Sequence, residues 1–164
     1  MSSRWKEVYK SLGVDLRQAS HADKADDFLS AILFRGGMAS AAQYNSKEDT
    51  VTVFECDDAS TMYHELTHWT GHPSRLDRIG GGREPSAEDR FLEEATAVAG
   101  SVFLTFYLDG REPTEDEAKI AQGNLAYHAK AGELSKKQVA KLLKIAEKQG
   151  HDALRYIKER LSDV

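Results

Sequence analysis

HELTHWTGH, residues 64–72, contains three of the chain's six histidines, spaced four residues apart, with a glutamate beside the first. Residues four apart share one face of a helix, so His64 and His68 can direct two ring nitrogens to one point. Glu65 lies about 100° around the helix from His64 and can reach a water bound at that point. The pattern therefore indicates two zinc ligands with a catalytic base beside them, or else a run of polar residues on a solvent-facing helix.

The residues around the motif favour the zinc interpretation. Valines alternate with threonines in residues 50–55, which predicts a strand with one face buried and the other partly covered. Asp57 or Asp58 can then cap a helix that runs to about Trp69, and Gly71 to Pro73 would end it. The motif is thus expected on a helix that directly follows a strand.

Other local signals predict an α+β fold, mostly helical with a small sheet in the N-terminal half. We expect helices at 3–12 and at about 22–30, and a short strand at 32–34. Three capping patterns predict later helices: Ser86 with Asp89 (to about Leu108), Thr114 with Glu117, and Ser135 with Gln138. Gly150 is expected to end the third, before a short last helix with Leu154, Ile157 and Leu161. Residues 1–164 would form one domain, in which 1–30 are a helical extension.

Composition narrows the function classes. The net charge of −5 gives no basic surface for strong nucleic-acid binding. The single cysteine, Cys56, excludes an intramolecular disulfide. The N-terminus is charged where a signal peptide would be apolar, and no stretch approaches the ~20 apolar residues of a membrane span. We therefore expect a cytoplasmic protein without a membrane partner.

A hydrolytic zinc site needs a third protein ligand and leaves the fourth position to water. His72 is nearest, but the expected helix break at Gly71 makes its direction uncertain. Glu93 and Glu94 follow on the next helix, whose buried face we expect to comprise Phe91, Ala95, Val98, Val102 and Phe106. Glu94 borders that face, whereas Glu93 would point toward solvent. Small residues at 95, 97, 99 and 100 would let this helix approach the motif helix. Glu94 is the predicted third ligand.

HELTHWTGHPSRLDR also resembles the metallopeptidase motif of plasmid antirestriction proteins of the ArdC type and of related domains in phage polyvalent proteins. Their pattern continues into an Arg-Leu-x-Arg tail, present here as Arg75, Leu76 and Arg78. AQYNSKEDTVTV and RFLEEATAVAGSVF resemble further family segments, and Tyr127 falls where a tyrosine occurs on a later helix. The resemblance runs from about Ile32 to near the C-terminus.

The resemblance implies a zincin-like fold, with His64, His68 and Glu94 as ligands of one zinc ion and Glu65 as catalytic acid/base. Two features depart from the family. Val98 stands where a second acid is usual, and the roughly 30 residues before the resemblance leave no room for the N-terminal single-stranded DNA-binding domain of full-length antirestriction proteins. We therefore do not expect DNA binding.

The leading functional hypothesis is a zinc-dependent peptidase acting on a protein or peptide, including a host defence protein, with possible antirestriction activity. Tyr127 or His72 could donate to the negative charge of the tetrahedral intermediate, although a core tyrosine and a surface histidine explain them as well. If the strand at 50–55 lies at the sheet edge, it could align an extended peptide. One alternative is a catalytically weak zincin-fold module that blocks a defence protein by contact. Another is a purely structural zinc ion joining two helices.

Overall fold

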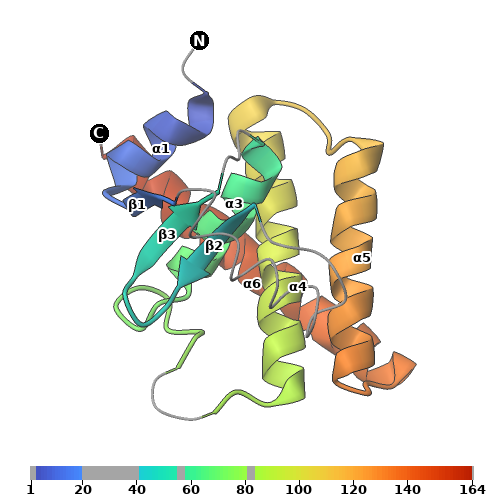
Figure 1. The fold of residues 1–164 in the computed structure, drawn as a ribbon. Coiled ribbons are helices and arrows are strands. Elements are labelled where there is room, and N and C mark those ends of the chain that lie inside the picture. Colours follow the sequence, from blue (N-terminus) through green and yellow to red (C-terminus); the bar gives the residue numbers. More distant parts are fainter. Residues whose placement is uncertain (1–2, 20–40, 55–57, 81–83, 164) are drawn as a thin grey trace.

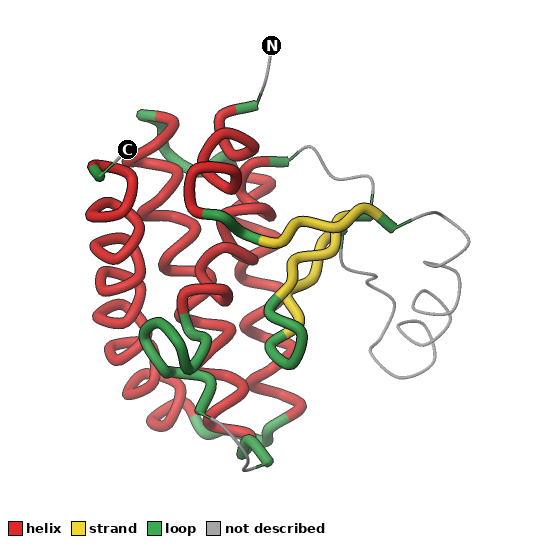
Figure 2. Tube along the Cα trace, turned by 90° about the vertical axis from the view of Figure 1, so that its left-hand side faces the viewer, coloured by secondary structure: helices red, strands yellow, loops and turns green. Residues whose placement is uncertain are grey.

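A small sheet lies against one side of a layer of helices (Figures 1 and 2). The computed structural model describes residues 3–19, 41–54, 58–80 and 84–163. In chain order the elements are α1 (Arg4–Leu12), β1 (Asp15–Gln18), β2 (Ala42–Asn45), β3 (Thr50–Val53), α3 (Ala59–Thr70), α4 (Ala87–Leu104), the π-helical turn η1 (Thr105–Asp109), α5 (Glu115–Ala131) and α6 (Lys136–Ser162). The mostly helical α+β class is confirmed. The helix and strand predicted within 22–34 lie outside the described residues.

The sheet has the order β1-β3-β2, with β1 parallel and β2 antiparallel to β3. The predicted strand at 50–55 is thus found at Thr50–Val53. It is the central strand, however, so neither of its sides can accept an added peptide. Both valines are buried, and on the other face Thr50 and Phe54 are buried while Thr52 is half-buried, which agrees with the prediction of one buried and one partly covered face. Among the described strands, β2 forms the edge of the sheet nearer the motif helix, and it contacts α3.

The main core lies where α1, α3, α6 and the sheet meet. Tyr9 of α1 is buried, and its hydroxyl donates to the carbonyl of Met62 in α3 at 2.6 Å. The predicted helix at 3–12 is confirmed, and Gly13 ends it with a left-handed φ of 69°. Through these contacts, the side of α3 that faces away from α4 is packed into the core. The side that faces α4 carries the functional side chains.

α4 is the central helix and contacts α3, α5 and α6. All three predicted capping boxes are present, at Ser86, Thr114 and Ser135. Ala87–Asp109 is the one described helical segment whose length and composition would suit a membrane span, but half of its most apolar window is buried inside the protein. That burial is typical of a core helix.

The prediction that Gly150 ends a helix was wrong, because α6 continues unbroken from Lys136 to Ser162. Gly150 is instead a packing residue. A Cβ atom added there would lie 2.8 Å from the Cβ of Ala99 in α4. The missing side chain lets α4 and α6 pack closely, and a glycine inside a helix is tolerated when tertiary packing compensates for its low helix propensity.

Candidate metal centre

The motif helix begins and ends where the sequence predicts. Asp58 caps α3 by accepting a hydrogen bond from the Thr61 backbone N–H, and the last helical residue is Thr70. His64 and His68 lie one turn apart on the face toward α4. Their Nε2 atoms are 3.1 Å apart. Both imidazoles therefore converge on one point, as the i, i+4 spacing predicts.

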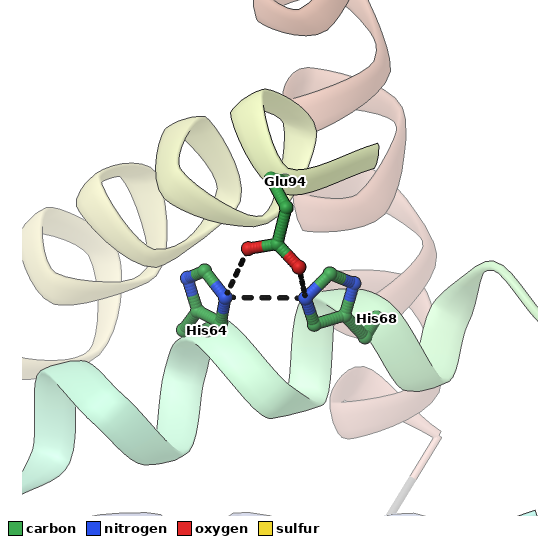
Figure 3. Close-up of side chains that lie close together, drawn as sticks. All are labelled: His64, His68 and Glu94. Carbon is green, nitrogen blue, oxygen red and sulfur yellow. Dashed lines mark hydrogen bonds and ion pairs between the residues drawn. The ribbon is translucent and has the colours of Figure 1, made fainter. Parts of the chain in front are cut away.

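Glu94 of α4 completes the group (Figure 3). Its carboxylate oxygens lie 3.3 Å from the Nε2 of His64 and 3.4 Å from the Nε2 of His68. α4 can come this close because Gly100 faces Thr67 of α3, where an added Cβ would lie 2.4 Å from the threonine side chain. The predicted close approach of the two helices is therefore found at Gly100.

These three side chains have the geometry that a bound cation needs. Ligand atoms about 2.0–2.2 Å from a tetrahedrally coordinated zinc ion lie roughly 3.2–3.6 Å apart. The two Nε2 atoms lie 3.1 Å apart, close to that range, and Glu94 approaches each of them with a different carboxylate oxygen, at 3.3 and 3.4 Å. One ligand atom from each residue lies within 4.8 Å of the others, and it is the one such group of His, Cys, Asp and Glu among the residues described. The cluster could thus hold a metal ion.

Glu93 does not point toward solvent, so that prediction was wrong. Its side chain is 20% exposed, and Oε1 lies 3.1 Å from the Nδ1 of His68. Arg78 donates to both carboxylate oxygens of Glu93 at 3.0 and 3.1 Å. A proton on Nδ1 shared with Glu93 leaves the Nε2 lone pair of His68 free for a metal, which is the usual arrangement behind a histidine ligand.

The prediction of a single buried face was wrong because α4 is enclosed on several sides. The predicted buried face placed Val98 and Phe106 inside, but Val98 is half-buried and Phe106 is 49% exposed. The π-helical turn η1 rotates Phe106 away from the α-helical register. With α3, α5 and α6 all packed on α4, both Glu93 and Glu94 face α3.

Electrostatics inside the cluster are strong. Burial would lower the pKa of His68, but the carboxylates of Glu94 and Glu93 outweigh it and raise that pKa well above 6.5. Burial would raise the pKa of Glu94, yet the hydrogen bonds and charges of His68 and His64 lower it. Glu94 is therefore ionised across the ordinary pH range. A cation would take the place of the proton that His68 otherwise holds.

Glu65 lies beside the cluster and is 6% exposed. One carboxylate oxygen, Oε2, accepts a hydrogen bond from the Tyr44 backbone N–H of β2 at 2.7 Å. Burial raises the pKa of Glu65, while the charges of His64 and His68 and the Tyr44 bond oppose that shift. A carboxylate with a raised pKa beside a metal-binding point is a candidate proton acceptor.

The two accessory candidates lie apart from the three convergent side chains. The Nδ1 of His72 faces the Ser74 hydroxyl at 2.7 Å in the loop after α3, and His72 is not part of the potential metal group. Tyr127 is 42% exposed, and its ring packs edge-on against His128. Neither contact brings these residues to the cluster.

Asn124 of α5 is a site residue that the sequence did not reveal. Its side-chain amide donates to Oε2 of Glu94 at 2.9 Å. The helix containing it is predictable from its capping box, but the pairing spans 30 positions of the chain and depends on how α5 packs against α4. The contacts of Arg78 with Glu93 could not be predicted from the sequence either, although Arg78 belongs to the Arg-Leu-x-Arg tail of the motif.

Known proteins agree with this architecture. The model of the MPTase-PolyVal family, described as a zincin-like metallopeptidase, matches residues 23–130. No curated protein matches the chain. The Mn(II)-bound crystal structure of the antirestriction protein ArdC from the R388 plasmid aligns with a TM-score of 0.54 and 23% identity, covering 96% of this chain and 53% of that one.

The metal-free ArdC structure gives the same TM-score with 22% identity, covering 97% of this chain and 52% of the other. The chain thus spans about half the length of these proteins. At such identities the likeness carries the fold, and it agrees with the ArdC-type resemblance in the motif. Because the family match extends over more than half of its residues, the chain belongs to the zincin-like metallopeptidase family.

Proposed function

We propose that this protein is a zinc-dependent peptidase in which His64, His68 and Glu94 hold one zinc ion. The observation that carries the proposal is the convergence of three potential ligands, one atom from each lying within 4.8 Å of the others, with the buried carboxylate of Glu65 alongside. When bound, zinc would lower the pKa of a water molecule and polarise the scissile carbonyl. The cluster's chemistry suits zinc because imidazole and carboxylate are its common ligands.

Glu65 is the proposed general base and acid. Its carboxylate takes a proton from the attacking water and then delivers it to the leaving amine, as bond cleavage requires. Glu93 and Arg78 keep the His68 ring in the orientation and tautomer that its ligand role needs. Asn124 restrains Glu94 in the same way.

An extended substrate is expected along β2 rather than along the central β3. The Phe54 N–H donates to the Ala41 carbonyl, so in the antiparallel ladder the Tyr44 carbonyl points away from β3. Strand addition there would place a peptide beside α3 and the cluster. We propose a protein substrate of a host defence system, met in the cytoplasm.

The test uses the purified, zinc-loaded chain, the Glu65→Gln variant and a chelated sample. Each is incubated with nuclease-based defence proteins, and new termini are identified by mass spectrometry. Cleavage by the wild type that falls at least ~10²-fold in Glu65→Gln supports the mechanism. Equal cleavage by the wild type and Glu65→Gln would contradict it, even with zinc present.

A second candidate is a zincin-fold module that inhibits a defence protein by contact. It is favoured by the Tyr44 N–H bond that occupies one oxygen of a nearly buried Glu65, and by Val98 in place of a second acid. In that case Glu65→Gln would keep the inhibition, and no new termini would form.

A further inference from the structure

Arg75, in the loop after α3, folds back onto the end of the motif helix. Its Nε donates to the Trp69 carbonyl at 2.6 Å, and its guanidinium carbon lies 3.9 Å from the centre of the Trp69 ring. The side chain is 9% exposed. A guanidinium that is both stacked and hydrogen-bonded has little rotational freedom. Its remaining nitrogens are therefore presented in one fixed direction.

That direction leads to Asp49, the last residue of the turn between β2 and β3. Nη1 of Arg75 donates to Oδ2 of Asp49 at 3.0 Å, and Nη2 pairs with Oδ1. Burial would raise the pKa of Asp49, but hydrogen bonds from Arg75 and Tyr44 lower it. Asp49 has a φ of 54°, in the left-handed region that Asp and Asn adopt more readily than most residues. This bidentate pair joins the turn to the motif helix.

Tyr44 extends the connection to the site. Its hydroxyl donates to Oδ1 of Asp49 at 2.9 Å, and its backbone N–H donates to Glu65 at 2.7 Å. This N–H points away from β3, so its partner is the carboxylate rather than a strand. The contacts form a closed circuit that leaves α3 at Trp69, passes through Arg75, Asp49 and Tyr44, and returns to α3 at Glu65.

We propose that Arg75 and Asp49 are positioning residues for Glu65, acting through the β2–β3 hairpin. They hold the hairpin at a fixed distance from α3. The Tyr44 N–H can then bind one carboxylate oxygen of Glu65, so that the other oxygen faces the cluster. The inference rests on the proposed function in giving Glu65 the role of base. The zinc ligands are outside this circuit, so metal binding does not depend on it.

The test compares Asp49→Asn and Arg75→Lys with matched controls. Asparagine tolerates the left-handed backbone, so Asp49→Asn removes the charge without straining the turn. Asp77→Asn is its control, because Asp77 also has a positive φ, of 51°, and lies outside the circuit. Arg155→Lys controls for the arginine change at an exposed position, because Arg155 pairs with Asp152 in α6 and not with the hairpin. Zinc content is measured in every variant and is expected to match the wild type.

The first readout is amide hydrogen exchange, followed by NMR in the full chain. The Tyr44 N–H should exchange about tenfold faster in both test variants, because its bond to a charged acceptor is no longer held in place. The Gln43 N–H faces β3 and should change little, as should both sites in the controls. Unchanged Tyr44 exchange would overturn the proposal. An equal rise at Gln43 and Tyr44 would also overturn it, since the pair would then only stabilise the hairpin.

The second readout separates positioning from substrate binding. With a cleaved peptide, kcat should fall on the order of 10- to 10²-fold in Asp49→Asn while KM changes little. A rise in KM at constant kcat would contradict a role through Glu65. If the wild type protects Tyr44 but cleaves no peptide, the proposed function fails and the positioning of Glu65 is still supported.

Discussion

The Nδ1 atom of His68 lies 3.1 Å from the carboxylate of Glu93, and the same carboxylate receives two hydrogen bonds from Arg78. The ion pair between Glu93 and Arg78 thus restrains the His68 ring at Nδ1. Two adjacent glutamates of α4 contact the two ring nitrogens of one histidine, because Glu94 approaches Nε2 while Glu93 approaches Nδ1.

Glu93→Gln should weaken zinc binding about 10- to 100-fold, the usual effect of removing a carboxylate behind a histidine ligand. Competition with a chromogenic chelator measures the change. Glu84→Gln is the control, because Glu84 is an exposed glutamate that pairs with Arg90. Equal affinities in the wild type and Glu93→Gln would contradict the support of His68 by Glu93.

Glu94→Ala should lose most of its zinc, whereas His72→Ala should retain about one ion per chain, as expected for the wild type. His68→Ala should resemble Glu94→Ala. Elemental analysis after dialysis measures the stoichiometry. A larger loss in His72→Ala than in Glu94→Ala would make His72 the third ligand.

Gly100→Ala should destabilise the fold by about 1–3 kcal/mol, because the new methyl group would overlap the Thr67 side chain. It should also push α4 from α3 and weaken zinc binding. Urea unfolding gives the free energy. The double variant with Thr67→Ala should recover part of both losses, while Gly123→Ala, where nothing lies within 4 Å, should be neutral or stabilising. Absence of any recovery would argue against direct contact.

Zinc should stabilise the protein more as the pH rises. The pKa of His68 is raised in the folded chain, so protonation of His68 stabilises the metal-free fold at pH values below the unfolded-state pKa near 6.5. This stabilisation is lost as the pH rises through the higher pKa of the folded state. Zinc needs the deprotonated ring, so its affinity increases over the same range. The difference in Tm with and without zinc, followed from pH 6 upward by scanning calorimetry, checks this. A difference that shrinks with pH would contradict it.

Much of this architecture follows from local signals. Asp58, Ser86, Thr114 and Ser135 cap helices through side chains that act within three residues, so sequence alone locates those helix starts. The convergence of His64 and His68 is equally local, since it depends only on helical spacing. The family motif and the small residue Gly100 then point to a partner helix.

The predictions that were wrong or incomplete concern residues whose structure depends on tertiary contacts. β1 is four exposed residues without apolar alternation, and it becomes a strand only by pairing with β3. The sequence pattern predicts a helix end at Gly150, whereas this glycine is needed for contact with Ala99. The prediction that Glu93 faces solvent was wrong because a helical wheel assumes one buried side, and α4 has neighbours on several.

The stretch from His64 to Arg78 has a consequence for engineering. It holds two of the proposed ligands, the proposed base, and both arginines that reach to the partners of those groups. Most of the proposed site residues therefore lie in one short, continuous segment of the chain. A host scaffold that receives this segment by grafting must supply a helix turn with paired glutamates, an amide like that of Asn124 beside them, and a hairpin with an aspartate at its left-handed position. Directed transplantation of the site thus reduces to matching these three contacts.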